Sequence, residues 1–333
     1  MQKHLLFLFL IVLLLLGGCT PNFGSFKEED PVSNLPPEAV YIDSNSIYDL
    51  STDLINSARK SIYIEQAEFN DARLIQLLIQ KAREGLEIKI LLDQYQQVNQ
   101  ATLEELKAQN ISVQYYPARK GQYQRVKLLV VDQEQAVVYG SSWTETDIKA
   151  HTAAIKLNER AAWKAAIVFS KDWEFTTTLS VDVPKSSLLP EDNITLATNA
   201  NIKQQIIKQI NDSTSTIWIE TSLVSETDTV QALIDAAAKG RDVRLLLDPT
   251  EAKENPLTIE KLMNHGIQIR YYPTDVPQRL NIGLFDNKTF IFSSSSWTYY
   301  SFVINHELSL TVPSAEATKK LVDLFNQDWN TGT

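Results

Sequence analysis

Apolar positions in the first half of the chain follow both helical and strand periods. Residues 47–59 place apolar side chains on one helical face, and residues 71–85 do the same up to Gly85, a typical residue after a helix end. Short β-rich runs lie between and after these helices, at residues 61–65, 86–93, 111–116, 126–131, 136–140 and 153–157. Strands that alternate with helices predict an α/β fold with a mostly parallel or mixed sheet flanked by helices.

The second half of the chain repeats this order. Residues 125–144, the first motif segment, read RVKLLVVDQEQAVVYGSSWT, and residues 279–298, the second motif segment, read RLNIGLFDNKTFIFSSSSWT. Corresponding residues lie 154 positions apart (279 − 125 = 286 − 132 = 297 − 143). Other matched elements drift only to 155 or 156, which confines insertions to loops. We infer an internal duplication with a first repeat over 39–175, a linker over 176–190 and a second repeat over 191–333.

The N-terminal sequence predicts that the protein is exported. The wholly apolar run 5–16 would form about 18 Å of helix, too short for a hydrocarbon core of roughly 30 Å, so residues 1–18 are interpreted as a signal peptide. Leu16-Gly17-Gly18-Cys19 resembles a bacterial lipobox, which implies cleavage before Cys19 and lipidation of its thiol. Residues 19–38 would then be a tether on the bacterial cell envelope. The alternative is an uncleaved signal anchor.

Composition narrows the class of protein. The 333 residues carry a formal net charge of −10, which argues against a broad nucleic-acid-binding face. Cys19 is the single cysteine, so no intrachain disulfide forms. The sequence shows no metal-ligand motif, phosphate-binding glycine loop or serine-hydrolase elbow, and we expect neither a metal nor a cofactor.

Each motif segment resembles the HxKxxxxD…GSxN signature of the phospholipase D superfamily. In the first segment Lys127, Asp132 and Gly140-Ser141 match, and in the second Asp286 and Ser295 match. The resemblance implies two α/β repeats packed face to face with one active site at their junction. It also implies that one histidine attacks a phosphodiester while the other transfers protons, and that lysines hold the phosphoryl oxygens.

The sequence departs from that signature at the residues that carry the chemistry. Arg125 and Arg279 replace both histidines, and Asn281 replaces the second lysine. Arginine keeps its proton, with a pKa above 12, and serves neither as a nucleophile nor as a proton shuttle near pH 7. On the sequence alone, the histidine mechanism is therefore expected to be closed to both repeats.

Two interpretations of the remaining cations stay open. Arg125, Lys127 and Arg279, with Ser141 and Ser295, would form a pocket for a phosphate or phosphodiester. Alternatively, each arginine pairs with a carboxylate and joins the two repeats. Glu307 matches the glutamate that orients a catalytic histidine in the superfamily, and here it would neutralise Arg279. The first repeat has Thr152 at that place, so Arg125 would be the freer cation.

Two histidines and two aspartates also occupy corresponding positions in the two repeats. His151 and His306 correspond (306 − 151 = 155) and are either relocated catalytic groups or packed side chains; alternation along a strand would turn His306 away from Glu307. Asp93 and Asp248 most simply cap turns. The aromatic residues after the motifs would contact a ligand or be buried against the other repeat, and these are Trp143, Trp297, Tyr299, Tyr300 and Phe302.

Three functions remain in view. The leading hypothesis is a membrane-anchored phospholipase D-like protein without the histidine chemistry, which binds a phospholipid, another phosphodiester or a partner. The first alternative is an active phosphodiesterase with relocated catalytic groups. The second is a structural or assembly lipoprotein.

Overall fold

The computed structural model describes residues 32–185, 188–273, 276–294 and 296–333. Of these, Val32–Thr333 form one compact unit. The expected signal peptide, Cys19 and Ser295 lie outside the described residues. Within the described part of the chain, no helix combines the length and apolar character needed to cross a bilayer.

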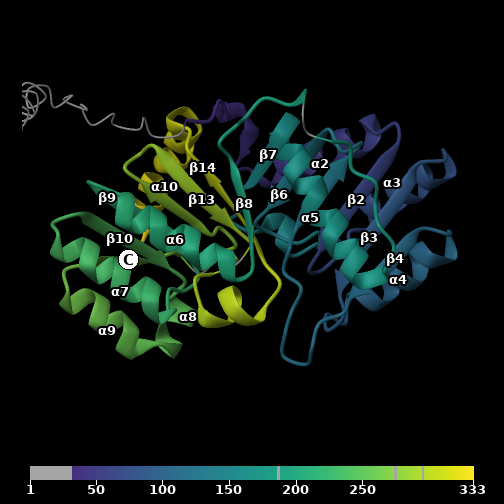
Figure 1. Ribbon diagram of the computed structural model, residues 1–333. Coiled ribbons are helices and arrows are strands. Elements are labelled where there is room, and N and C mark those ends of the chain that lie inside the picture. Colours follow the sequence, from purple (N-terminus) through teal and green to yellow (C-terminus); the bar gives the residue numbers. More distant parts are fainter. Residues whose placement is uncertain (1–31, 186–187, 274–275, 295) are drawn as a thin grey trace, which may run out of the picture. The chain divides into compact units, whose positions relative to one another are not determined.

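Each half of the compact unit is built on a seven-stranded sheet (Figure 1). The first sheet has the order β1-β7-β6-β5-β2-β3-β4, with β1 Val40–Tyr41, β2 Ser61–Gln66, β3 Glu87–Asp93, β4 Ser112–Tyr116, β5 Leu128–Val131, β6 Gln135–Tyr139 and β7 Ala154–Asn158. The second has the order β11-β10-β9-β12-β13-β14-β8, with β8 Thr195–Thr198, β9 Thr216–Thr221, β10 Asp242–Leu247, β11 Gln268–Tyr271, β12 Ile282–Phe285, β13 Thr289–Ser293 and β14 Leu308–Val312.

Both sheets are mixed, and they correspond strand by strand. Parallel pairing is confined to β2–β3–β4 and to β9–β10–β11, where helices cross over between strands. The other pairs are antiparallel, and they include the β5–β6 and β12–β13 hairpins, whose connections are short. This confirms the duplication and the α/β class, with less parallel pairing than the alternation of strands and helices suggests.

Helices cover both faces of each sheet, and the core between the sheets is shared. Helices α5 Glu159–Thr177 and α10 Ala315–Thr331 contribute to one buried cluster that includes strands of both repeats. The outer face of the first sheet packs under α2 Ser44–Ser57, α3 Ala72–Arg83 and α4 Asn99–Ala108. The outer face of the second packs under α6 Ala200–Asp212, α7 Thr227–Ala238, α8 Pro249–Glu254 and α9 Pro256–Asn264. The repeats therefore pack face to face across a continuous core.

Local sequence signals set the helix ends. Asp71 caps α3 by accepting hydrogen bonds from the amides of Arg73 and Leu74 at 3.0 and 2.9 Å. Gly85 follows the helix with φ +93°, a conformation that side-chain-bearing residues rarely adopt. His265 is the C-cap of α9, and its Nδ1 lies 2.7 Å from the carbonyl oxygen of Lys261.

The segment just before β1 packs onto the second repeat. The amide of Ser33 donates to the carbonyl of Pro313 at 2.7 Å, and the hydroxyl of Ser314 donates to the carbonyl of Leu35 at 2.7 Å. Leu35 is buried in the shared core, followed by η1 Pro37–Ala39. Residues 32–38 are expected from the sequence to belong to the tether, whereas the structure has them inside the compact unit.

Candidate functional site

The two motif segments meet through their backbones at the junction of the repeats. The amide of Arg125 donates to the carbonyl of His306 at 2.8 Å, and the amide of Arg279 donates to the carbonyl of His151 at 2.8 Å. Each motif segment thus pairs with a loop of the other repeat. This exchange brings the residues at both histidine positions of the superfamily signature to one place.

The two motif aspartates stabilise the fold rather than the junction. Asp132 accepts hydrogen bonds from the amides of residues 59–61, and Asp286 accepts from the amides of residues 214–216. Burial opposes ionisation of Asp286, but these hydrogen bonds outweigh it and lower its pKa to about 2. Each aspartate therefore holds the turn that leads into β2 or β9.

Lys127 is buried and joins the repeats. Its Nζ donates to the carbonyl oxygen of Ser294 at 2.7 Å and lies 3.3 Å from the carbonyl oxygen of Arg125. Burial lowers the pKa of Lys127 to about 8, opposed by the charges of Glu307 and Asp147 and reinforced by Arg125 and Arg279. Three cations and two carboxylates therefore share the junction.

Arg279 takes its ion pair from the first repeat. Its Nε lies 3.1 Å from Oδ1 of Asp147, which belongs to η2 Asp147–Lys149, and its side chain is 46% exposed. The sequence pattern predicts this neutralising role for Glu307. Instead, Glu307 accepts hydrogen bonds from the hydroxyl of Ser294 and from Nδ2 of Asn305, at 3.3 Å for the latter. The motif pattern does not specify the position of η2, to which Asp147 belongs.

Among the residues that the structure describes, Arg125 makes the fewest polar side-chain contacts of the three junction cations. Its guanidinium lies 4.9 Å from the ring centroid of Tyr123, and among the described residues no carboxylate comes within ion-pair distance of it. The nearby Asp93 uses its carboxylate on the amides of Tyr95 and Gln124, both at 2.6 Å. Arg125 therefore keeps donors that a ligand can use.

The remaining motif residues are buried and make local contacts. Asn281 accepts a hydrogen bond from the hydroxyl of Thr221 at 2.7 Å, so it fills the lysine position with a buried polar contact. Ser141 lines a cavity of about 20 Å³, which has room for a water molecule, beside α2. A Cβ at Gly140 would lie 2.9 Å from the carbonyl oxygen of Arg279, which explains a glycine at this close approach.

The two motif-adjacent histidines are exchanged between repeats. His306 Nε2 lies 2.9 Å from Asp172, and His151 Nε2 lies 3.0 Å from Glu220 and 3.1 Å from Asp328. His306 belongs to the second repeat but contacts a carboxylate of the first, and His151 does the reverse. Sequence reasoning missed these partners, although the carboxylates recur at the duplication offsets (220 − 65 = 155; 328 − 172 = 156).

Both histidines are held by their surroundings rather than exposed to a substrate. The His306 ring is buried and stacked on Tyr116, with Nδ1 3.0 Å from Oδ1 of Asn199. The His151 ring stacks on Tyr272 at 4.6 Å. The His306 ring contacts Asp172 and Asn199, whereas the Glu307 carboxylate contacts Ser294 and Asn305, so the two neighbouring side chains have different surroundings. These contacts favour packed histidines over relocated catalytic groups.

His151 makes stability depend on pH. Burial opposes its charge, but Asp328 and Glu220 outweigh this and raise its pKa from 6.5 to about 9. The stabilisation that comes from a raised folded-state pKa is fully present below pH 6.5 and is lost as the pH rises towards 9. The lowered pKa of Lys127 makes the free energy of unfolding rise with pH instead, but mainly from about pH 8 upwards. We therefore expect the free energy of unfolding to fall by about 1.5 kcal/mol from pH 6.5 to 8.

Denaturant unfolding at several pH values tests this expectation, with His151→Gln and His265→Gln variants measured beside the wild type. The exposed His265 serves as the control because it caps a helix outside the junction. The slope of the free energy of unfolding against pH should flatten in His151→Gln and persist in His265→Gln. An unchanged slope in His151→Gln would show that another group carries the effect.

The aromatic residues after the motifs divide into two sets. Trp143 and Trp297 are buried, but each packs in the core of its own repeat and not against the other repeat as the sequence suggests. Phe302 is buried as well. In contrast, Tyr299 and Tyr300 are 54% and 65% exposed, so of the two alternatives burial against the other repeat does not apply to them.

Comparisons with known proteins agree with this architecture. A family model described as the PLD-like domain of cardiolipin synthase matches residues 52–173 and residues 206–329. The cardiolipin synthase of Clostridium perfringens (strain 13 / Type A) is 24% identical over 338 residues, which cover 87% of this chain and 69% of the relative.

Two solved structures resemble the whole compact unit. Phosphatidylserine synthase of Haemophilus influenzae Rd KW20 has a TM-score of 0.69 at 13% identity, covering 89% of this chain and 87% of its own. Polyphosphate kinase from Porphyromonas gingivalis has a TM-score of 0.64 at 12% identity, covering 90% of this chain and 48% of its own. Because the sequence identities are so low, these two similarities support only the two-repeat fold and not a function.

Proposed function

This chain belongs to the family of cardiolipin synthase PLD-like domains in the phospholipase D superfamily, and from that membership we propose that it binds the phosphate of an anionic phospholipid at the repeat junction without histidine-based hydrolysis. The relatives' names, cardiolipin synthase and phosphatidylserine synthase, describe phospholipid chemistry. Phospholipid is therefore the ligand class that we carry over to this chain.

The observation that carries the proposal is the pair of arginines at the two histidine positions. Arg279 is half exposed, and Arg125 has no ion-pair partner among the described residues. Guanidinium groups bind phosphate oxygens through bidentate hydrogen bonds and keep their charge at any physiological pH. The geometry supports binding in the place where histidine-bearing relatives would carry out transfer.

The surface beside the junction suits a bilayer. The π-helix η4 Tyr300–Ile304 and the residue before it expose Tyr299, Tyr300 and Val303 at 54%, 65% and 46%. The β4–β5 loop carries the exposed Arg119 and Lys120. We call these five residues the lipid face. Tyrosine prefers the membrane–water interface, and basic residues attract anionic headgroups.

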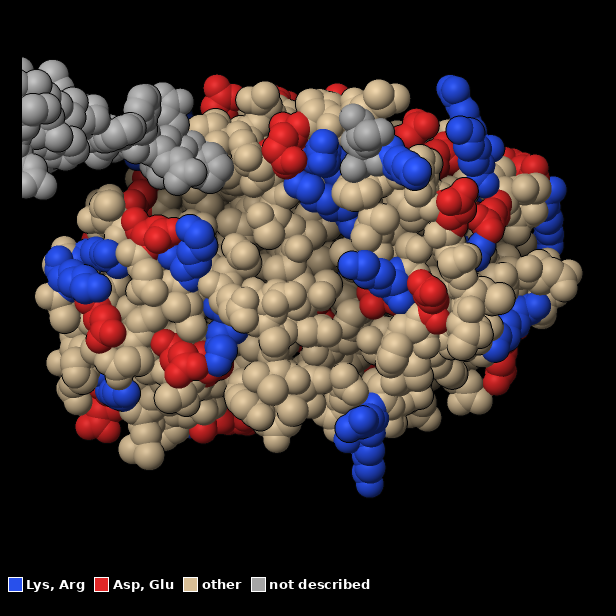
Figure 2. All heavy atoms as spheres, in the orientation of Figure 1, with Lys and Arg blue, Asp and Glu red and all other residues tan. Residues whose placement is uncertain are grey.

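Two hydrogen bonds place the two parts of the lipid face side by side. The amide of His306 donates to the carbonyl of Tyr123 at 2.8 Å, and the amide of Tyr123 donates to Oδ1 of Asn305 at 3.2 Å. Figure 2 shows uncharged side chains over the lower centre of the molecule with a basic side chain projecting beside them. Arg125 follows directly on the same segment, so the proposed phosphate site opens near this face.

We also propose that the protein is exported and lipid-anchored through Cys19. The apolar run 5–16 and the lipobox-like sequence before Cys19 support this. Such an anchor would keep the lipid face close to phospholipid headgroups. Membrane fractionation of the wild type and of Cys19→Ser tests the anchor, because loss of lipidation should release the variant into the soluble exported fraction.

Vesicle binding tests the phospholipid proposal. Residues 20–333 keep the whole compact unit and lack the signal peptide, and they are expected to sediment with phosphatidylglycerol vesicles but not with phosphatidylcholine vesicles. Replacing Arg125 and Arg279 by Gln should weaken binding roughly 10-fold for each charge-assisted hydrogen bond that is removed. Arg119→Gln and Lys120→Gln should each weaken it about fivefold.

Lys288→Gln is the matched control, since it removes one exposed positive charge from the β12–β13 turn. Vesicle binding by Lys288→Gln should weaken only as much as the loss of one positive charge outside the lipid face causes. Equal binding by the wild type and by the Arg125→Gln/Arg279→Gln double variant would contradict the junction site. In that case the ion pairs across the junction would favour the structural lipoprotein instead.

A further inference from the structure

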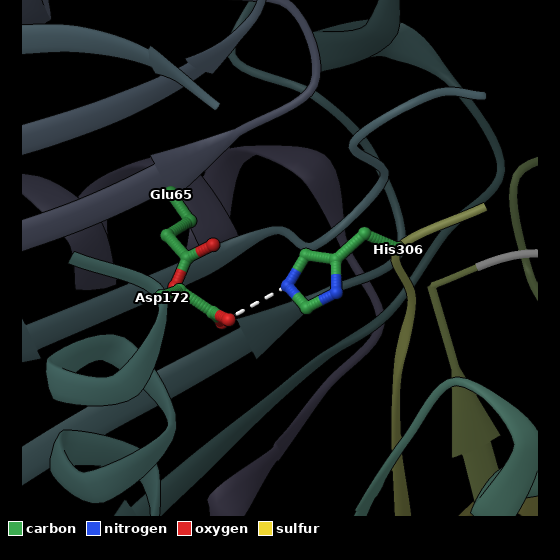
Figure 3. Close-up of side chains that lie close together, drawn as sticks. All are labelled: Glu65, Asp172 and His306. Atoms are coloured by element: carbon green, nitrogen blue, oxygen red, sulfur yellow. Dashed lines mark hydrogen bonds and ion pairs between the residues drawn. The ribbon is translucent and has the colours of Figure 1, made fainter. Parts of the chain in front are cut away.

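Three ligand-type side chains converge in a buried cluster between the repeats (Figure 3). Glu65 lies at the end of β2, Asp172 lies on α5, and His306 precedes β14. Their ligand atoms lie within 4.8 Å of one another, and all three residues are buried. The sequence shows no metal motif here, because these residues lie 107 and 134 positions apart (172 − 65; 306 − 172).

The His306 ring is oriented in the manner of a metal ligand. Oδ1 of Asn199 accepts from the amide of Glu307 at 3.2 Å, and His306 Nδ1 lies 3.0 Å from the same oxygen. This oxygen is therefore an acceptor, so Nδ1 carries the proton that it receives. Nε2 then faces the carboxylates of Asp172 and Glu65. Histidine ligands of metals are usually fixed by such a hydrogen bond from the other ring nitrogen.

The cluster has more hydrogen-bond acceptors than donors. Glu65 is fully buried, and its Oε1 accepts no hydrogen bond from any described residue, while Oε2 accepts from Nε2 of Gln124 at 3.1 Å. Oε1 of Gln124 is likewise buried and without a hydrogen-bond partner in the described chain. Buried oxygens of this kind normally meet a donor or a cation.

The equivalent cluster of His151, Glu220 and Asp328 differs in the contacts of its histidine. There, His151 Nε2 contacts both Glu220 and Asp328, at 3.0 and 3.1 Å. One imidazolium therefore serves two carboxylates. In the Glu65 cluster, His306 Nε2 pairs with Asp172 at 2.9 Å and, among the described residues, with no second carboxylate. The two clusters thus differ in the contacts of the imidazole. Each keeps a buried carboxylate oxygen without a hydrogen-bond partner among the described residues, Glu65 Oε1 in one and Glu220 Oε2 in the other.

We propose that Glu65, Asp172 and His306 bind one divalent transition-metal ion of the Zn²⁺ type. One imidazole nitrogen and two carboxylate oxygens suit such ions, whereas Mg²⁺ and Ca²⁺ prefer oxygen ligands alone. The two carboxylates balance the charge of the ion. Gln124 Oε1 is available as a further oxygen ligand. Because His306 comes from the second repeat, the ion joins the repeats and stabilises their junction.

Metal binding by the full-length protein in detergent tests the proposal. After removal of metals by chelator, equilibrium dialysis should show one tightly bound Zn²⁺ per chain and no tight Mg²⁺ or Ca²⁺. Saturating Zn²⁺ should raise the Tm by about 5 °C. Glu65→Gln should weaken Zn²⁺ binding at least about 100-fold, whereas the matched Glu220→Gln should leave it unchanged.

X-ray absorption of the wild-type complex provides a measurement that needs no variant. The expected first coordination shell contains one imidazole nitrogen and otherwise oxygen, without the sulfur of Cys19. No tight Zn²⁺ binding, a shell without imidazole, or equal loss in Glu65→Gln and Glu220→Gln would each overturn the proposal. The cluster would then be a hydrogen-bonded contact between repeats, like its counterpart at His151.

Discussion

Wild-type protein is expected to hydrolyse bis(p-nitrophenyl) phosphate about a millionfold more slowly than a histidine-bearing member of the superfamily assayed in parallel. The reason is chemical. Arg125 and Arg279 occupy both histidine positions, and a guanidinium with a pKa above 12 neither attacks phosphorus nor exchanges a proton near pH 7. His151 and His306 do not replace them, since carboxylates and stacked tyrosines hold both rings.

Lys127→Ala provides the sharpest control for this first prediction. Lys127 is the junction cation with a lowered pKa, about 8, and is therefore the best remaining proton-transfer group. Its Nζ donates to the carbonyl oxygen of Ser294 in the other repeat, so we assign Lys127 a role in holding the repeats together and not in proton transfer. We expect the residual rate to be the same in Lys127→Ala and the wild type. A rate well above background that Lys127→Ala abolishes would establish an active enzyme.

A restoring variant separates two possible causes of the expected inactivity. Arg125→His/Arg279→His with Asn281→Lys rebuilds the superfamily signature at the positions that differ from it most. Turnover in this variant would show that the substitutions alone account for the loss. Continued inactivity would show that the ion pair of Arg279 with Asp147, or the bond of Lys127 to Ser294, has also closed the junction.

The sequence predicted the fold well because its signals are local and occur twice. The 154-residue offset, the helix end at Gly85 and the aspartates at the ends of β5 and β12 all depend on residues near one another or on repetition. Resemblance to the superfamily extended these signals to the two-repeat arrangement. The match to residues 52–173 and 206–329 agrees with that arrangement.

The partners of the charged residues were harder to predict. Strand alternation predicts that His306 and Glu307 point to opposite faces, but it does not indicate which residues lie on each face. The partner of His306 is Asp172, and the partner of Arg279 is Asp147; both contacts cross between repeats. Such pairings depend on how two sheets pack, and a single sequence carries no periodic signal for them. For the same reason the sequence did not show that Trp143 and Trp297 pack in the cores of their own repeats.

His151→Ala is expected to destabilise the protein by about 3–5 kcal/mol at pH 7, because it leaves two neighbouring carboxylates buried without a counter-charge. Glu220 is fully buried and Asp328 nearly so, and the imidazolium of His151 contacts both. Urea unfolding measures the loss, with His265→Ala as the control. That exposed histidine should change stability by no more than about 0.5 kcal/mol.

A double-mutant cycle shows whether the loss arises from the buried charges. Glu220→Gln removes one carboxylate charge with almost no change in volume, so it should recover part of the stability that His151→Ala loses. The coupling between the two substitutions is expected to exceed about 1 kcal/mol. Additive losses would mean that His151 acts mainly through its stacking on Tyr272, at a centroid distance of 4.6 Å. A large coupling would identify the exchanged histidine as an electrostatic link between the repeats.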